Sequence, residues 1–330
     1  MIMDRRQFIA LSAAGAAAPV LRAGSAFADT KYPAGNIRLL VPYAAGGVVD
    51  AVARNWAERM RQPLGTLVVE NQGGGGGTIG AATVARAKPD GYTLLFGDTS
   101  CQIIAPYLML RPPYDPTKDF TPISMIATSS TAIVVHPSVP ATNLTEFIRY
   151  AKEHQDKLSY GSAGTGTVTH LAGELFKQLI GAPKILHVPY RGAGPGLIDL
   201  VAGVLPMMTP NVTSQVLAFH RAGKVRILAV CAPQRLKAAP EIPAATESLP
   251  GMVVQLTCGV LGPAGLPQPV VDQIAGITAK AVQDPGFNQA LGAAGLEARS
   301  DASPTGAREF LVAERKHLLP IIKAAGLQPQ

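Results

Sequence analysis

Short loops of small and hydroxyl residues give this 330-residue chain its clearest chemistry. The first loop follows the apolar run Ile37–Val41, which predicts a buried strand, and precedes a helical pattern that begins near Val49. With so little side chain present, a ligand can approach the loop backbone closely, and the first-turn N–H groups of the helix would point at an anion. An ordinary strand-to-helix turn is the alternative. The loop consists of Tyr43, Ala44, Ala45, Gly46 and Gly47.

A second loop of this kind lies between Leu158 and His170. Its backbone N–H groups and hydroxyls could hold a carboxylate or a phosphate ahead of a helix predicted from about Thr167. It is not a P-loop, because no lysine follows Gly166, and it is not a nucleophile elbow, because Tyr160 replaces that motif's first glycine. The candidate ligand-binding residues here are Ser162, Ala163, Thr165, Gly166 and Thr167.

A third loop, Pro189–Pro195, follows a strand predicted at Ile185–Val188. Arg191 is the one cation in the three loops, so it could form a bidentate contact with a carboxylate, or it could simply face solvent. Another predicted strand ends at Asn211, whose side chain would enter the same region. Asp50 could receive an amino or hydroxyl group of a ligand, or it could only complement the positive N-terminus of the first helix.

Catalytic readings of these residues are weak. Ser162 and His170 could pair as nucleophile and base, but His170 falls one turn into a predicted helix, where a packed histidine is commoner. The sequence contains no H-E-x-x-H, no paired-carboxylate motif and no cluster with metal-ligand spacing. We therefore expect a binding protein without enzymatic activity, catalytic residues, metal or cofactor.

A glycine run supplies the main alternative. Gly75, Gly77 and Gly80 match G-x-G-x-x-G between a predicted strand and helix, and Asp98 ends the next strand, as in dinucleotide-binding proteins. However, the glycines begin only after Asn71 and Gln72, and five consecutive glycines match many patterns by chance. An exported NAD-dependent oxidoreductase remains the alternative reading.

Residues 1–28 have the features of an export signal. A basic start containing Arg5 and Arg6 is followed by a short apolar stretch and by Ala26-Phe27-Ala28, as in a cleavable secretory signal. The arginine pair resembles the twin-arginine export signal. The apolar stretch is too short to span a bilayer. We expect cleavage near Ala28 and a soluble periplasmic protein.

Composition narrows the remaining possibilities. The formal charge is +7, but basic residues are scattered and only 5% of residues are aromatic, so no nucleic-acid partner is predicted. Cys101, Cys231 and Cys258 are widely spaced in apolar surroundings, which favours buried free thiols. The chain without its signal exceeds what a single core usually supports, which predicts two lobes.

The order of elements indicates an α/β fold. Each predicted strand of the N-terminal part is followed by a helical pattern, which is typical of a parallel sheet. Two long β-rich runs, Ile123–His136 and Val253–Leu261, are predicted to cross between lobes. Asn143 is predicted to cap a helix, with Glu146 in the reciprocal position.

Six stretches together resemble the Bug family, the extracytoplasmic solute receptors of tripartite tricarboxylate transporters. The resemblance implies a two-lobed, type II-like periplasmic binding protein fold, in which each lobe is a mostly parallel sheet flanked by helices and two crossing hinge strands join the lobes. It places the first lobe at residues 29–128 plus 252–330 and the second at 129–251. The stretches are VPYAAGGVVDAVAR, VVENQGGGGGTIGA, KPDGYTLLFG, PYDPTKDFTPIS, LSYGSAGTGTVTHLAGELFK and HVPYRGAGPGLIDLVAG.

The resemblance also implies how a ligand is held. Backbone amides and ordered water from the first loop and from the second lobe would bind its carboxylate, and Thr99 and Ser100 match a pocket-facing loop of the family. Two departures are evident. Tyr43, Ala44 and Ala45 stand where the family usually has a phenylalanine and two prolines, and Pro210-Asn211 replaces a typical Asp-Asn, which removes a carboxylate from the pocket wall.

By this resemblance the chain is a monomeric periplasmic receptor. It would capture a small organic acid, namely a di- or tricarboxylate, an aromatic acid or an amino acid, and deliver it to membrane transporter subunits. A sensory receptor with the same fold is a further alternative. Sequence does not name the acid.

Overall fold

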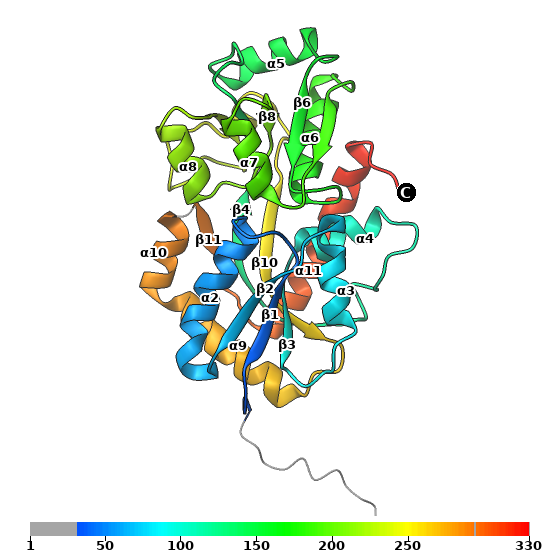
Figure 1. Ribbon diagram of the computed structural model, residues 1–330, viewed down its shortest axis with the longest axis vertical. Coiled ribbons are helices and arrows are strands. Elements are labelled where there is room, and N and C mark those ends of the chain that lie inside the picture. The colour runs from blue at the N-terminus through cyan, green and yellow to red at the C-terminus, as the bar shows by residue number, and fades with distance from the viewer. Residues whose placement is uncertain (1–31, 294, 330) are drawn as a thin grey trace, which may run out of the picture. The chain divides into compact units, whose positions relative to one another are not determined.

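The structure, a computed structural model, describes residues 32–293 and 295–329, and Gly35–Gln330 forms one compact unit. The predicted export signal lies outside the described residues. Within the described part of the chain, no helix is both long enough and apolar enough to cross a bilayer. The compact unit contains two β-sheets, each with its own helices, which we call the first and second lobes (Figure 1).

The first lobe is built on a six-stranded sheet with the order β11-β4-β10-β3-β1-β2. β1 pairs in parallel with β2 and β3, whereas β10 runs antiparallel to β3 and β4. The strands are β1 (Ile37–Val41), β2 (Leu67–Asn71), β3 (Thr93–Asp98), β4 (Phe120–Ser130), β10 (Gln255–Pro263) and β11 (Leu296–Ala298).

Helices flank this sheet. The Trp56 indole is fully buried and donates a hydrogen bond to Thr278 Oγ1 at 3.2 Å, which joins α2 to α9. A 3₁₀ turn, Gly75–Gly77, precedes α3, and a π-helical turn, Ser100–Ile104, follows β3. The helices are α2 (Val48–Leu64), α3 (Thr78–Ala85), α4 (Ala105–Tyr107), α9 (Gln268–Gln283), α10 (Pro285–Ala293) and α11 (Pro304–Ala324).

The second lobe has a five-stranded sheet with the order β7-β6-β8-β5-β9. Its strands are β5 (Ala132–Val135), β6 (Ser159–Ser162), β7 (Leu186–Pro189), β8 (Met207–Met208) and β9 (Arg226–Val230). Its helices are α5 (Leu144–Glu153), α6 (Val168–Ile180), α7 (Ala193–Val201) and α8 (Ser214–Arg221), and a 3₁₀ turn spans Ala245–Glu247. β8 is shorter than predicted because Pro206 and Pro210 flank it and neither can donate to the ladder.

Two adjacent segments join the lobes, as predicted. β4 ends at Ser130 in the first sheet, and β5 begins at Ala132 in the second. Thr131 between them bonds to the returning segment, donating its N–H to the Val254 carbonyl at 3.1 Å. Because these crossing strands run opposite to their neighbours, both sheets are mixed rather than mostly parallel.

The helix starts fall into two groups. Side chains cap α5, α6, α8 and α11: Asn143, Thr167, Thr213 and Ser303 each accept a hydrogen bond from a first-turn N–H. The reciprocal bond predicted for Glu146 is wrong, because its carboxylate accepts from Thr142 instead. By contrast, α2, α3 and α7 begin at glycines, Gly47, Gly77 and Gly192, which have no side chain to satisfy the first-turn donors, and α4 and α9 also lack a side-chain cap. The three cysteines are buried and free, as predicted.

Candidate ligand-binding site

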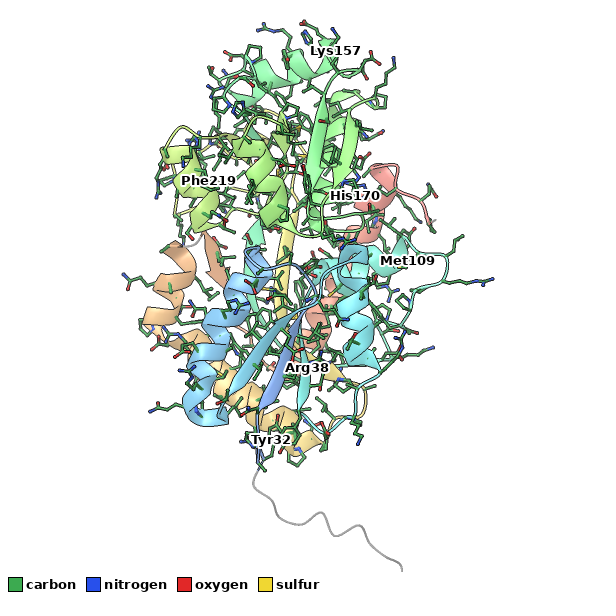
Figure 2. All side chains as sticks on the ribbon, viewed as in Figure 1. Tyr32, Arg38, Met109, Lys157, His170 and Phe219 are labelled. Carbon is green, nitrogen blue, oxygen red and sulfur yellow. The ribbon has the colours of Figure 1, made fainter. Side chains whose placement is uncertain are left out.

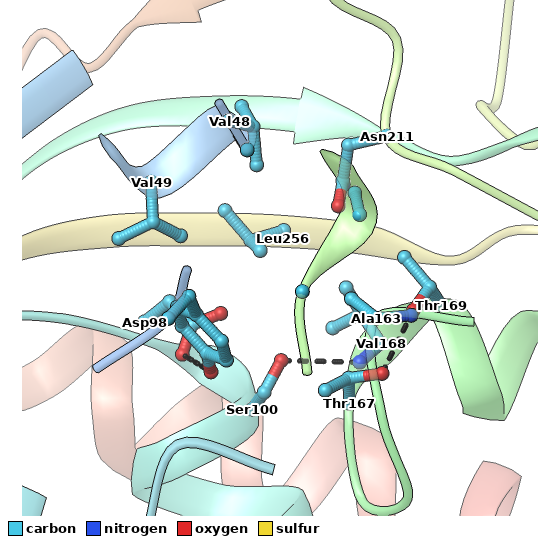
Figure 3. A pocket seen from close by; sticks show the side chains of 14 residues that line it. Val48, Val49, Asp98, Ser100, Ala163, Thr167, Val168, Thr169, Asn211 and Leu256 are labelled. Atoms are coloured by element: carbon cyan, nitrogen blue, oxygen red, sulfur yellow. Dashed lines mark hydrogen bonds between the residues drawn. The ribbon is translucent and has the colours of Figure 1, made fainter. Parts of the chain in front are cut away.

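A cavity of about 340 Å³ is lined by residues of both lobes (Figure 3). The first lobe contributes Tyr43, Gly47, Val48, Val49, Asp98, Ser100 and Leu256. The second lobe contributes Ala163, Thr167, Val168, Thr169, Gly192, Ala193 and Asn211. Eight of these lie outside the predicted site, the last of them on the returning crossing strand: Val48, Val49, Asp98, Val168, Thr169, Gly192, Ala193 and Leu256.

Two of the uncapped helix starts, those of α2 and α7, meet at this cavity. Gly47, Val48 and Val49 bring the N-terminus of α2 to it, while Gly192 and Ala193 bring that of α7 from the other lobe. The partial positive charge of each helix start, with its unpaired N–H groups, makes this a place for negative charge.

Asp50 fixes the first loop and does not line the cavity. Its carboxylate accepts hydrogen bonds from the Gly46 N–H at 3.1 Å, Asn71 Nδ2 at 2.9 Å and Arg54 Nε. Burial opposes ionisation of Asp50, but the bonds from Arg54, Asn71 and Gly46 outweigh it and lower the pKa. Two roles were predicted for Asp50, receiving a polar group of the ligand or supporting the start of the helix. The contacts match the second, structural role.

Asp98 is the carboxylate that reaches the cavity. It is 1% exposed, and its Oδ1 accepts hydrogen bonds from the Tyr43 hydroxyl at 2.7 Å and from the Cys101 N–H at 3.1 Å. No residue in the described part of the chain lies at hydrogen-bonding distance from its Oδ2. Burial raises the pKa of Asp98, although the bonds from Tyr43 and Cys101 oppose that rise. Sequence reasoning considered Asp98 only for a dinucleotide, yet its place at the carboxyl end of β3 was a usable signal.

Asn211 lines the same cavity with its side-chain amide. The residue is 6% exposed, and its buried Nδ2 has no hydrogen-bond partner among the residues that the structure describes. Figure 3 shows Asp98 and Ser100 on one side of the cavity and Asn211 on another. The Val168 N–H donates to Ser100 Oγ at 3.1 Å, which links the two lobes within the cavity wall.

The second predicted loop already uses most of its donors internally. The N–H groups of Ala163, Gly164, Gly166 and Thr167 bond to Thr169 Oγ1, Ser162 Oγ, His170 Nδ1 and the Gly164 carbonyl, in that order. Ala163 and Thr167 line the cavity, whereas Ser162 and Gly166 do not. The loop therefore forms part of the cavity wall but has few free N–H groups with which to bind a ligand.

Ser162 pairs with a different histidine from the one considered in the sequence. Its Oγ lies 2.7 Å from His187 Nε2, and the His187 and His170 rings stack with their centroids 4.2 Å apart. The Ser162–His170 pair is therefore wrong. Burial lowers the pKa of His170 to about 4 and that of His187 to about 3, so both rings are neutral near pH 7. His170 lies at the end of the second lobe nearest the first (Figure 2).

The remaining predicted residues lie around this cavity without lining it. Ala44 donates its N–H to the Arg191 carbonyl at 3.3 Å, and the Thr99 hydroxyl donates to the Thr257 carbonyl at 3.1 Å. Thr165 and Arg191 line a neighbouring cavity of about 540 Å³, together with the glycine run. Ala44, Ala45, Gly46 and Thr99 line neither cavity.

The glycine run permits close contact between the lobes. A Cβ on Gly76 would lie 2.3 Å from the Thr165 carbonyl oxygen, and one on Gly77 would lie 2.7 Å from the Tyr43 hydroxyl. Asp98, the acidic residue that the dinucleotide pattern requires, is instead bound to Tyr43 beside the other cavity. These contacts explain the glycines without a dinucleotide. In the described residues, no three His, Cys, Asp or Glu side chains gather as metal ligands.

Two α/β lobes that share a cavity at their helix starts define a solute-binding protein of the periplasmic binding protein fold. The family model "Tripartite tricarboxylate transporter family receptor" matches residues 52–327, and the chain belongs to this family.

Relatives agree with this assignment. A UPF0065 protein of Bordetella pertussis is 36% identical over 315 residues, which are 94% of this chain and 95% of that protein. The structure of the periplasmic binding protein BugD is 34% identical with a TM-score of 0.86, covering 91% of this chain and 100% of that one. An R. palustris protein with adipate is 30% identical with a TM-score of 0.87, again covering 91% and 100%.

Proposed function

We propose that the protein is a periplasmic receptor that captures a small organic acid in this cavity and delivers it to a membrane transporter. The observation that carries the proposal is the meeting of two uncapped helix starts, at Gly47 and Gly192, in one cavity. A carboxylate there accepts from backbone N–H groups of both lobes, so binding favours the arrangement in which the lobes touch.

Asn211 and Asp98 complete the polar contacts. The unpaired Asn211 Nδ2 donates to a carboxylate oxygen. An ionised Asp98 would repel the ligand, and burial, which raises the pKa of Asp98, works against its ionisation. Tyr43 keeps this carboxyl in place by donating to its other oxygen.

The rest of the ligand meets an apolar wall formed by Val48, Val49 and Leu256. This apolar wall suits the hydrocarbon part of a small acid. Adipate in the R. palustris relative is an aliphatic dicarboxylate, and we extend that class to this chain.

The proposal that the protein delivers its ligand to a transporter rests on its membership of this family. Predicted export at residues 1–28, the two crossing segments at Thr131 and Val254, and a monomeric state fit a receptor whose lobes move about a hinge. The lobe boundaries, 29–128 plus 252–330 and 129–251, remain part of the proposal.

A thermal-shift panel tests the ligand class. Adipate, citrate, benzoate, glutamate and NAD are compared at equal, high concentration near pH 7. A ligand at about 100 times its Kd adds roughly 2.7 kcal/mol of apparent stability. A shift with a carboxylate supports the receptor, and a shift with NAD alone overturns it. For delivery, uptake of the identified acid is compared in cells with and without the gene, and equal uptake argues against a transport role.

A further inference from the structure

Apart from the candidate ligand site and its neighbouring cavity, a further cavity of about 730 Å³, which we call the second cavity, lies in the first lobe between the π-helical turn, the start of β4 and α11. No residue lines both this cavity and the candidate ligand site. The two are nevertheless neighbours in sequence, because Ser100 faces the first cavity and Gln102, on the same turn, faces the second. π-Helical turns are rare and are frequently found at functional sites.

Gln102 is the first reason to assign a ligand here. Gln102 is 3% exposed, and among the described residues neither its Oε1 nor its Nε2 has a partner at hydrogen-bonding distance. Its amide does act on the neighbouring Cys101 thiol, where it opposes the rise in pKa that burial causes. A buried amide whose hydrogen bonds are so poorly satisfied is costly, since its donors and acceptor have lost water with little replacement. A molecule in the cavity that accepts from Nε2 would remove part of that cost.

Two guanidinium groups supply the charge. Arg308 and Arg315 line the cavity from α11, seven residues apart and therefore on one face of the helix. Neither has an ion pair or a side-chain hydrogen bond to any residue that the structure describes. An unpaired guanidinium favours a carboxylate, which it can bind through two parallel hydrogen bonds.

The wall also has an apolar part. Ile103, Phe120 and Leu311 line it, together with the less apolar Thr117 and Thr121. A bare inorganic anion would leave this surface unused, whereas an acid with a hydrocarbon tail would cover it.

From these features we propose a second binding site for a small monocarboxylate with an apolar tail. The carboxylate binds Arg308 or Arg315 and accepts from Gln102 Nε2, while the tail lies against Ile103, Phe120 and Leu311. This site goes beyond the proposed receptor function and does not depend on it.

The test uses the full-length purified protein and hexanoate as the probe, followed by calorimetric titration. Ala193→Phe is introduced throughout to fill the first cavity. On that background, Gln102→Leu and Arg315→Gln alter the second cavity, and Lys316→Gln is the matched control, since Lys316 is exposed on α11 and does not line the cavity. 1-Hexanol tests whether the tail alone binds.

We expect hexanoate to bind the Ala193→Phe protein and the Lys316→Gln control equally, and 1-hexanol to bind neither. Arg315→Gln and Gln102→Leu should each weaken binding about tenfold or more. Gln102→Leu should also match or exceed the parent in stability without hexanoate, because it removes the unpaired amide. This separates lost binding from lost folding.

Three results would overturn the site: no hexanoate binding on the Ala193→Phe background, equal binding by the Gln102 and Arg315 variants, or equal binding of 1-hexanol. None of them bears on the receptor function, which the carboxylate panel with an unfilled first cavity tests separately.

Discussion

The Val168 N–H of the second lobe donates a hydrogen bond to the Ser100 hydroxyl oxygen of the first lobe at 3.1 Å. Both residues line the candidate ligand site, so this bond lies where a ligand would touch both lobes. The hydroxyl also acts on Asp98, whose pKa it lowers, and a carboxylate placed here could accept its hydrogen instead. Ser100 would therefore take part both in the contact between the two lobes and in the binding of the ligand.

Ser100→Ala should weaken carboxylate binding by about 0.5–1.5 kcal/mol, the usual contribution of a neutral hydrogen bond. The change is measured by calorimetric titration with the acid found in the panel. Ser300→Ala, at an exposed position away from the cavity, is the control and should bind like the wild type. Equal affinities for both variants would exclude Ser100 from the site.

Asn211→Leu should cost more, about 1.5–3 kcal/mol of binding, because the unpaired Nδ2 would donate to a charged carboxylate. Its effect on the free energy of unfolding should be small, since the donor has no partner to lose. Asn288→Leu, at an exposed site on α10, is the control. A loss of stability without a loss of affinity would assign Asn211 to the fold alone.

Gly76→Ala tests the close approach of the lobes. Gly76 and Gly181 have nearly equal φ values, 65° and 67°, so alanine strains both backbones by a similar amount, about 1 kcal/mol. Only at Gly76 would the new Cβ collide, 2.3 Å from the Thr165 carbonyl oxygen, while Gly181 has open space. We expect ligand affinity to fall in Gly76→Ala and to be unchanged in Gly181→Ala.

Calorimetry and urea unfolding separate the two effects for this glycine pair. Both variants should lose similar stability, and only one should lose affinity. If both kept full affinity, the lobes would not need this contact in order to bind.

Much of this arrangement could be predicted from local pattern. The apolar run before Tyr43 and the hydroxyl-rich loop before Thr167 predicted two strand-to-helix junctions, and both occur. The donors that remain free could not be predicted, because Thr169 and His170 reach back from α6 to satisfy Ala163 and Gly166. Such hydrogen bonds from loop N–H groups to helix side chains depend on side-chain geometry within a folded turn.

Tertiary pairing explains the other differences. Leu256 reaches the cavity only because β10 returns to the first sheet beside β4, far from either loop in the sequence. His187 pairs with Ser162 because β7 lies next to β6, an order that no local pattern contains. The position of Asp98 at the end of a strand could have marked it as a candidate site residue. Only the folded structure shows that its second carboxylate oxygen is buried away from water.

Asp98→Asn should change how stability depends on pH. The pKa of Asp98 is raised in the folded state. Its contribution to the stability of the wild type is therefore fully present below the pKa of the unfolded state, near 4, and is lost as pH rises through the pKa of the folded state. The variant should therefore gain stability relative to wild type as pH rises from 4 to 8, measured by urea unfolding. It should also bind the acid at least as well at pH 7, because Nδ2 can donate where Oδ2 stood. Weaker binding would mean that the ligand donates to an ionised Asp98.

The stacked rings of His170 and His187 should determine how far the folded state loses stability in acid. Burial holds the pKa of His170 near 4, well below its ordinary 6.5, so its contribution to stability is present above pH 6.5 and is lost as pH falls toward 4. Protonation would also break the bond that His170 Nδ1 accepts from the Gly166 N–H. The wild type should lose on the order of 3 kcal/mol over this range through His170, measured by urea unfolding at pH 7 and 4.5.

His170→Gln should reduce that acid dependence and leave the part due to His187, because glutamine keeps a hydrogen-bond acceptor without a titrating group. His317→Gln, at an exposed site on α11, is the matched control and should lose stability in acid as the wild type does. Since Thr167 and Val168 beside Gly166 line the ligand cavity, affinity at pH 4.5 should follow the same order, with the His170 variant retaining more of its neutral-pH binding. Identical acid profiles for all three proteins would exclude His170 as the group that limits the fold.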